Sequence, residues 1–167
     1  MPEPEPTFDP RGLLAALDRY RVAYIVVGAF ARVVQGADEV TRGVDIVPST
    51  RKDNLRRLDA ALAELGARRP DGTEPAFAGA EKLEPVVELA TDRGELKIIP
   101  EPEGTRGYED LRRAATREHI GQGLRPAVAS LGDLSRMLAS LGREDDMPKL
   151  LDLRRLAELE ISYGIEI

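Results

Sequence analysis

Two hydrophobic patterns alternate along the chain from Asp9 onward. Apolar residues that recur every three or four positions predict amphipathic helices at residues 10–21, 29–34, 51–65, 107–115, 131–141 and 146–160. Short apolar or alternating runs bounded by turn-forming residues predict strands at residues 23–27, 44–47, 86–90, 95–99 and 125–129. The order of these elements predicts an α+β fold, in which helices flank a small β-sheet and further helices follow it.

Residues that cap helices mark three of these boundaries. Asp9 is a good N-cap because its side chain can accept a hydrogen bond from the first helical turn. Ser49 or Thr50 is expected to cap the helix that follows in the same way. Ser130 and Asp133 have the spacing of a capping box at the start of the helix at residues 131–141.

Turn-forming residues divide the second half of the chain. Residues 68–84 contain several Pro and Gly residues and predict a long loop, with at most one irregular strand. The connection Thr91–Gly94 is suited to a β-hairpin with Gly94 at the position of positive φ. Because a hairpin joins antiparallel strands, the sheet is expected to be mixed.

The chain divides into three parts. Residues 1–8, rich in Pro and Glu, are expected to form a disordered arm. Residues 9–129 are expected to form the α/β core, and residues 130–167 a C-terminal helical segment and tail. The closing segment at residues 161–167 is apolar enough to predict that it docks on the protein.

Composition excludes several kinds of site. The 167 residues contain no Cys, which excludes disulfides, thiolate zinc sites and thiol nucleophiles. They contain one histidine, His119, which argues against a His-based triad or a poly-His metal site. A metal ion would therefore need carboxylate ligands. With a net charge of −6, the chain lacks the overall excess of basic residues that nucleic-acid-binding proteins usually carry. No apolar run approaches the roughly 20 residues of a membrane span, so a cytoplasmic protein without membrane contact is expected.

One carboxylate interrupts the predicted strand Val44–Val47. Alternation places Val44 and Ile46 on one face of this strand and Asp45 on the other. Gly28, directly after the first strand, either belongs to a phosphate-cradling turn or only permits a tight turn from strand to helix. Both interpretations of Gly28 stay open at this stage.

The segments Tyr24–Ala31 and Thr41–Pro48, with Gly36 between them, resemble the core of the nucleotidyltransferase superfamily related to DNA polymerase β. They are most similar to the small bacterial nucleotidyltransferases grouped with abortive-infection toxins. The resemblance continues through Gly94–Gly104 and Val128–Leu134 and covers residues 20–156. It implies the nucleotidyltransferase fold.

The resemblance also implies roles for particular positions. The turn after the first strand would cradle a nucleoside triphosphate, and a Thr-x-Asp-x-Asp run with a third carboxylate from a later strand would bind two metal ions. The implied nucleotide-binding positions are Gly28, Ala29, Thr41 and Arg42, and the implied catalytic positions are Gly43, Asp45 and Lys97. Two carboxylates two residues apart on a strand point the same way, as a two-metal clamp requires.

The chain departs from this pattern at the ligand positions. Gly43 stands where the first acid belongs and Lys97 where the third is expected, so Asp45 is the one remaining metal ligand. Ala29 offers no hydroxyl to a phosphate. Glu39, Leu138 and Asp145 replace residues that are often basic in the family. These departures imply a degraded metal and nucleotide site.

An ion pair between Lys97 and Asp45 is one expected consequence. The ammonium group would occupy the space of the lost metal ions and compensate a partly buried carboxylate. Lys97→Ala is then expected to destabilise the fold.

Other charged segments are interpreted as solvated surface. Five arginines could form an RNA-facing patch, but Asp53, Asp59 and Glu64 interleave with them, which favours a mixed-charge face: Arg51, Arg56, Arg57, Arg68 and Arg69. The acidic residues Glu101, Glu103 and Glu109 have the irregular spacing of a solvated loop.

Three functions follow as hypotheses. The first is a catalytically inactive binding or regulatory protein of the toxin–antitoxin kind, without a cofactor, whose partner is another protein or a second copy. The alternative is an active enzyme that uses Mg²⁺ and moves a nucleoside monophosphate from an NTP to a hydroxyl of RNA, a protein or a small molecule, with Glu95 or Glu101 completing the clamp. The third is a structural domain that dimerises through its apolar tail.

Overall fold

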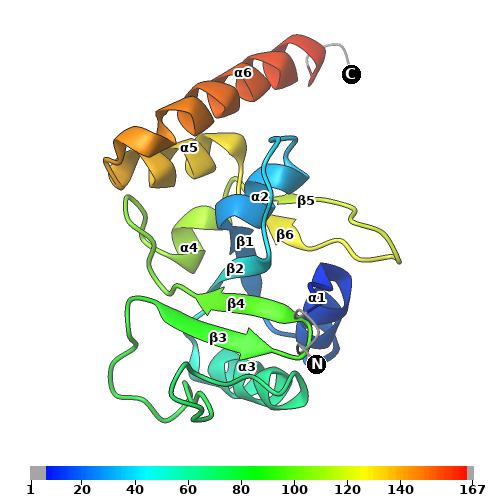
Figure 1. The fold of residues 1–167 in the computed structure, drawn as a ribbon, viewed down its shortest axis with the longest axis vertical. Helices are drawn as coiled ribbons and strands as arrows, with labels where there is room; N and C mark the ends of the chain where they lie inside the picture. The colour runs from blue at the N-terminus through cyan, green and yellow to red at the C-terminus, as the bar shows by residue number, and fades with distance from the viewer. Residues whose placement is uncertain (1–6, 165–167) are drawn as a thin grey trace, which may run out of the picture.

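The computed structural model describes residues 7–164, with side chains through Ile161. Its helices are α1 (Pro10–Arg19), α2 (Gly28–Val34), α3 (Lys52–Glu64), α4 (Tyr108–Leu111), α5 (Leu131–Ser140) and α6 (Met147–Gly164), with a 3₁₀ turn η1 (Glu144–Asp146) before α6 (Figure 1). Its strands are β1 (Tyr24–Val27), β2 (Gly43–Pro48), β3 (Val87–Thr91), β4 (Gly94–Ile98), β5 (Thr116–Arg117) and β6 (Ala127–Val128).

The six described strands form one mixed sheet in the order β3-β4-β2-β1-β6-β5. The hairpins β3/β4 and β5/β6 and the pair β1/β2 are antiparallel, whereas β2/β4 and β1/β6 are parallel. Gly94 has φ +124° in the β3/β4 hairpin, as predicted. Residues with a side chain rarely adopt this backbone conformation, which is why glycine occupies the turn. The predictions of an α+β fold and a mixed sheet are confirmed.

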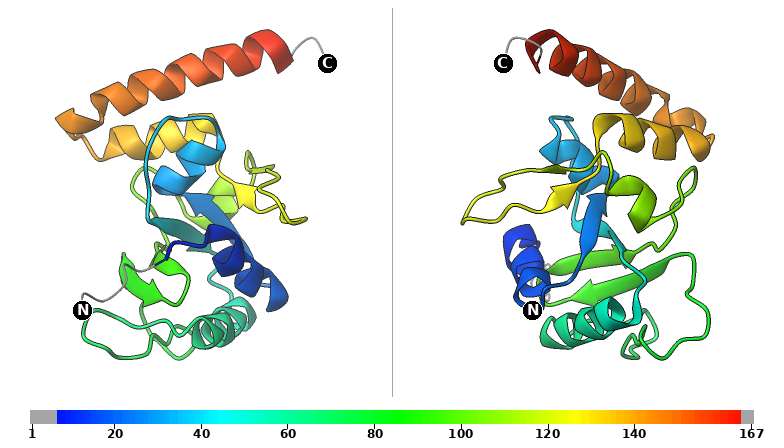
Figure 2. Two further views of the ribbon diagram at one scale, coloured as in Figure 1. Left: turned by 45° about the vertical axis from the view of Figure 1, so that its right-hand side comes forward. Right: turned by 180° about the vertical axis from the view of Figure 1, so that it is seen from behind.

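Helices pack at both ends of this sheet. Figures 1 and 2 show α1 and α3 near β3 and β4, and α5 and α6 together beyond α2 at the opposite end of the molecule. The alternation of β2 places Val44 and Ile46 in the core, as predicted. One buried cluster joins the sheet to the flanking helices and includes Leu13, Leu17, Val26, Val44, Ile46, Leu58, Leu62, Leu96, Ile98, Leu134 and Leu153.

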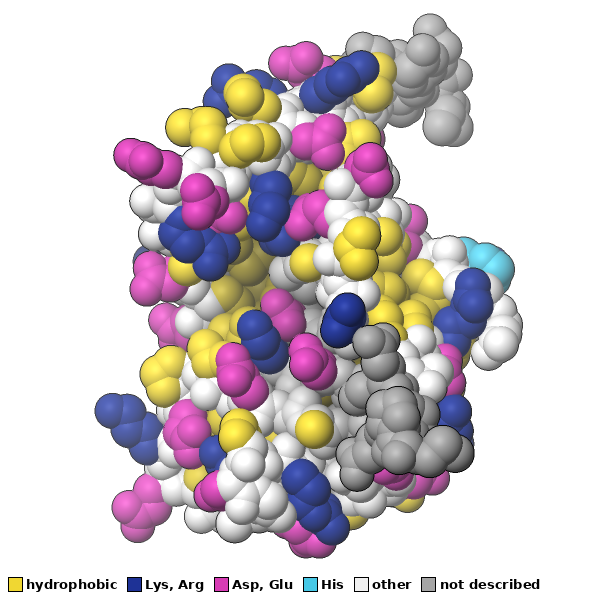
Figure 3. Space-filling model, in the orientation of Figure 1, with side chains coloured by type: hydrophobic (Ala, Val, Ile, Leu, Met, Phe, Trp, Pro, Cys, Tyr) yellow, Lys and Arg dark blue, Asp and Glu magenta, His cyan; other side chains and the backbone are white. Residues whose placement is uncertain are grey.

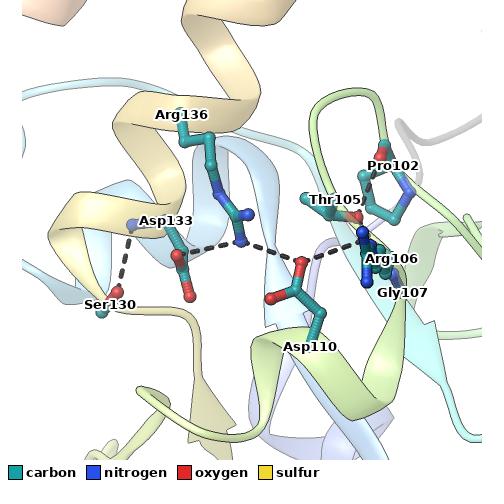
Figure 4. A network of polar contacts seen from close by, with 8 residues as sticks. All are labelled: Pro102, Thr105, Arg106, Gly107, Asp110, Ser130, Asp133 and Arg136. Atoms are coloured by element: carbon teal, nitrogen blue, oxygen red, sulfur yellow. Dashed lines mark hydrogen bonds and ion pairs between the residues drawn. The ribbon is translucent and has the colours of Figure 1, made fainter.

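A polar network connects α5 to α4 (Figure 4). The Arg136 guanidinium lies 3.0 Å from the Asp110 carboxylate and 3.1 Å from that of Asp133. Asp110 also accepts a 2.9 Å hydrogen bond from the Arg106 backbone N–H, and this bond, ahead of Arg136, holds the pKa of Asp110 below its usual value. Ser130 accepts a hydrogen bond from the backbone N–H of Asp133, which confirms the predicted N-cap of α5.

The predicted N-cap of α3 is wrong. The cap residue is Arg51, which makes no side-chain capping bond, and neither Ser49 nor Thr50 caps the helix. Ser49 is buried beside Asn54, whose side chain donates to the Ser49 carbonyl at 2.8 Å and accepts from the Ala23 N–H at 2.7 Å. Asn54 therefore ties the entry of α3 to β1 in place of a local cap.

Short elements depart furthest from the pattern. The helix predicted at residues 107–115 is only Tyr108–Leu111. Beyond Leu111 the helical hydrogen bonding is interrupted, because the Arg113 N–H donates over a shorter range to the Asp110 carbonyl at 3.4 Å. Strand β5 was not predicted, and β6 covers only two of the five residues predicted as a strand. The loop at residues 68–84 contains no strand, although Arg68 forms an isolated bridge with Ala90 of β3.

The predictions for the two ends are only partly within the described residues. Residues 1–6 and the side chains of residues 162–167 lie outside them. Phe8, assigned to the arm, packs edge-on against Phe30 with ring centroids 6.1 Å apart. Ile161, at the start of the segment expected to dock, is 63% exposed. In the described part of the chain, no helix is long and apolar enough to cross a membrane.

Candidate functional site

The structure brings together all seven residues that the sequence analysis singled out. Six of them line a hollow of about 150 Å³ between the β1–α2 turn and strands β2 and β4: Ala29, Thr41, Arg42, Gly43, Asp45 and Lys97. Val44 and Glu95 complete its wall. Gly28 lies beside the hollow against Asp45. The fold therefore places the residues named from the family resemblance next to one another.

Asp45 is held at the middle of the site by two strands. It pairs with Val27 of β1 on one side and with Lys97 of β4 on the other. Its carboxylate lies directly over Gly28, where an added Cβ atom would be 2.3 Å from the Asp45 Oδ2 atom. Gly28 also has φ +71°. The turn and the close approach of Asp45 thus require glycine at position 28 without any bound phosphate.

The charge on Asp45 is disfavoured in the folded protein. Partial burial raises the pKa of its carboxyl group, and the nearby Glu88 raises it further, whereas Lys97 and Arg32 act in the opposite direction. Burial is the largest of these effects, so the pKa lies above its ordinary value. Among the described residues, no side chain forms an ion pair with Asp45. The site therefore contains a partly buried carboxylate without direct compensation.

The predicted ion pair between Lys97 and Asp45 is wrong. The Lys97 ammonium lies 3.9 Å from the Glu88 carboxylate, and the Lys97 side chain is 45% exposed. Glu88 is its cross-strand neighbour on β3, so the flexible lysine extends along the solvated face of the hairpin. Lys97 acts on Asp45 only through its charge at longer range.

Gly43 of β2 lies close against its register partner Glu95 of β4. A Cβ atom at this position would be 2.7 Å from the backbone oxygen of Glu95 and 2.8 Å from its Cβ atom. Contacts this short with backbone require the strands to move apart. The position that would carry the first acid of the motif has no room for a side chain in this sheet.

Thr41 is used structurally at the entrance to β2. Its hydroxyl donates to the Gly43 carbonyl at 2.9 Å and accepts from the Gly43 N–H at 3.3 Å. These two bonds close the turn that leads into the strand. Arg42, the neighbouring residue, is exposed on the wall of the hollow.

The sequence analysis missed Arg32 as part of this site. The Arg32 guanidinium on α2 makes two hydrogen bonds of 2.7 and 3.0 Å to the Glu39 carboxylate, and both side chains are almost fully buried. The positive charge of Arg32 also partly offsets the rise in the pKa of Asp45 that burial causes. The replacement of a basic residue by Glu39 was the one available signal, since a buried Glu requires a cation nearby.

A hollow of about 300 Å³ on the β3/β4 hairpin shares Glu95 and Lys97 with this site. Two larger hollows contain none of the site residues. One of about 620 Å³ beside α4 is lined by mixed charges, including the Arg136 and Asp110 side chains that already pair with each other. Another of about 640 Å³ lies between residues 81–85 and α4. Neither contains the chemistry that the sequence motif implied.

The remaining charged candidates are surface residues. Arg51 and Arg57 lie near Asp53, and Arg68 and Arg69 pair with acidic neighbours. Figure 3 shows acidic and basic side chains interspersed over the visible face. His119 is exposed. Within the described residues, no three His, Cys, Asp or Glu side chains come together to hold a metal ion, so the acidic stretch around Glu101 forms no such cluster.

Comparison with solved structures identifies the fold. The lincosamide antibiotic adenylyltransferase LnuA, solved with lincomycin bound, matches with a TM-score of 0.59 and 16% sequence identity, over 90% of this chain and 99% of LnuA. The candidate nucleotidyltransferase TM1012 from Thermotoga maritima matches with a TM-score of 0.56 and 19% identity, over 90% of this chain and 97% of TM1012. The antibiotic-resistance factor ANT(2'')-Ia matches with a TM-score of 0.56 and 18% identity, over 92% and 82% of the two chains.

These matches show that the chain has the nucleotidyltransferase fold. No protein-family model matches the sequence, and no curated protein matches it.

Proposed function

We propose that this protein uses the nucleotidyltransferase fold without transferring nucleotides, and that it acts by binding a partner protein, as the antitoxin of a toxin–antitoxin pair does. The packing of Gly43 against Glu95 is the observation that carries the proposal. An acid at position 43 would need space that the backbone of β4 already occupies. The loss of this ligand is thus part of the sheet geometry and not only a change of one side chain.

The residues of the hollow do not fit a pair of magnesium ions. Mg²⁺ prefers octahedral oxygen coordination, and two-metal sites bridge their ions with several carboxylates. Among the described residues, Asp45 and Glu95 are the only carboxylates that line the hollow, and Lys97 and Arg42 bring positive charges beside them. Because the two cations only balance the two carboxylates, the lining has no excess of positive charge to attract a triphosphate.

A thermal-shift titration with Mg²⁺ and each of ATP, GTP, CTP and UTP tests the loss of nucleotide binding. A ligand present at 100 times its dissociation constant stabilises its binder by about 2.7 kcal/mol, or roughly 5–11 °C for a domain of this size. We expect no shift for this protein, whereas the adenylyltransferase LnuA with ATP serves as the positive control. A shift of several degrees that disappears in Asp45→Asn would contradict the proposal.

The partner is tested separately, by native mass spectrometry of the tagged chain purified from the cells that produce it. We expect a complex that contains this chain and one other polypeptide in fixed stoichiometry. Recovery of this chain alone, or only of its own oligomers, would contradict the binding role and would leave the result on nucleotides unaffected.

One observation favours the alternative of an active enzyme. Asp45 and Glu95 line the same hollow, which supports Glu95 as the candidate for a second metal ligand. In that case the chain would transfer a nucleoside monophosphate to a hydroxyl of RNA, a protein or a small molecule. Magnesium-dependent transfer of label from an NTP, abolished by Glu95→Gln and retained in Glu88→Gln, would support this alternative.

A further inference from the structure

Helix α6 exposes an apolar face away from the rest of the protein. Its inner face packs on the core through Leu153, which is fully buried, with Leu150 and Leu156 beside it. On the other side, Leu151 is 57% exposed and Ile161 is 63% exposed. Figure 3 shows exposed hydrophobic side chains among charged ones along the top of the molecule, where α6 lies.

The exposed residues form one continuous stripe. Met147, Leu151, Arg154, Glu158 and Ile161 follow one another at intervals of four, three, four and three residues, the spacing that keeps positions on one side of a helix. All five are exposed. The apolar residues of the stripe therefore flank a central pair of opposite charges.

The two central charges have no partner within the described part of the protein. The described ion pairs near the start of α6 use Arg143, Asp146 and Lys149. Arg154 and Glu158 form none there, although they lie four residues apart on the same helix. Their side chains are therefore available to an external group of complementary charge.

We propose that this stripe binds the same stripe of a second copy of the chain, with the two α6 helices antiparallel. When Leu151 faces Ile161 of the second copy, the stripe residues between these two positions also lie opposite each other, because their spacing is the same read in either direction. Arg154 then faces Glu158 of the second copy, and Glu158 faces Arg154. Two apolar contacts thus flank two ion pairs in a symmetric, isologous interface.

Other arrangements of the same two helices are unfavourable. In a parallel pair, Arg154 faces Arg154 and Glu158 faces Glu158. In the antiparallel register that pairs Met147 with Ile161 of the second copy, Arg154 faces Arg154 of that copy. The other stripe residues of the two helices then no longer lie opposite one another. Charge complementarity therefore selects one register. This self-complementarity is the reason for assigning the face to a second copy and not to an unrelated protein.

The contact is short. Ten residues separate Leu151 from Ile161, which corresponds to about 15 Å of helix. An interface of this length lies at the small end of the range for specific association. The dimer is therefore reversible and depends on concentration. The inference is independent of the nucleotide site.

Charge reversals tested by sedimentation equilibrium distinguish this interface from any other. Arg154→Glu places acid against acid at both ion pairs, and Glu158→Arg places base against base, so each variant is expected to dimerise about tenfold more weakly or worse than the native chain. The double variant R154E/E158R restores opposite charges and is expected to dimerise like the native chain. Circular dichroism checks that every variant is folded.

Mixing the two single variants gives the sharpest outcome. Each pair in the mixed dimer joins Glu to Arg, so R154E and E158R are expected to form a heterodimer more tightly than either variant forms a homodimer. Arg56→Glu on the exposed face of α3 is the matched control, with the same change of charge and no expected effect. A native chain that stays monomeric at millimolar concentration, or a dimer that tolerates both single reversals, would overturn the proposal.

Discussion

Substituting Gly43 tests the packing that excludes the first acid of the motif. In Gly43→Ala the new Cβ atom would lie 2.7 Å from the Glu95 backbone oxygen, and both atoms belong to paired strands at the centre of the sheet. Overpacking of this kind costs about 1–3 kcal/mol of the free energy of unfolding. For a domain of this size, that corresponds to a decrease in Tm of roughly 2–12 °C.

The assay is thermal unfolding followed by circular dichroism, with Gly79→Ala as the matched control. Gly79 has no atom within 4 Å of the added Cβ position and does not have a left-handed backbone. The control is expected to be stabilised by about 0.4–1 kcal/mol, because alanine reduces the entropy of the unfolded chain. Gly43→Asp should be less stable still than Gly43→Ala, since it adds a carboxylate beside Glu95 and Asp45. A Gly43→Ala protein at least as stable as the native chain would refute the reasoning.

Three further substitutions test the charges around the hollow. Asp45→Asn is expected to raise the free energy of unfolding in urea at pH 7, because burial raises the pKa of Asp45 and folding therefore disfavours the ionised form. The gain should shrink as the pH falls through the raised pKa and vanish below the ordinary aspartate pKa of 3.8, and a loss of stability at pH 7 would contradict it. Lys97→Ala is expected to change the free energy of unfolding by less than about 0.5 kcal/mol, because Lys97 is exposed and its contact with Glu88 is long. A larger loss in urea denaturation would support an ion pair between Lys97 and Asp45 after all. Arg32→Met should cost about 3–5 kcal/mol in the same assay because it leaves Glu39 buried without its partner, and an unchanged midpoint would show that the pair is not needed.

The elements predicted from sequence are those with a strong local signal. Strands β1 and β2 and helix α3 carry continuous or periodic hydrophobic residues, and Gly94 marks the β3/β4 hairpin. Local patterns of this kind reflect the burial of one face and need no knowledge of distant contacts. Strand β5 has only two residues, both exposed, so its place in the sheet depends on pairing with β6 and left no pattern to detect.

The residues of the candidate site were predicted, but their interactions were not. The motif resemblance singled out Asp45, Gly43 and Lys97, and the register of β2 and β4 brings these three residues to one hollow. The expected Asp45–Lys97 pair failed because Lys97 has a closer cross-strand neighbour in Glu88, which only the register of β3 reveals. The Arg32–Glu39 pair likewise depends on how the chain returns from α2 to β2.

The most direct test of the central claim is an NMR titration of the isotope-labelled chain with Mg²⁺ and each nucleoside triphosphate. The amide signals of Gly28, Asp45 and Lys97 report on the hollow itself, and those of Leu58 and Leu62 in α3 serve as distant references. We expect that none of the three site signals shifts at millimolar nucleotide. Saturable shifts at these residues, absent in Asp45→Asn, would show that the site still binds a nucleotide and would contradict the proposed loss of nucleotide transfer.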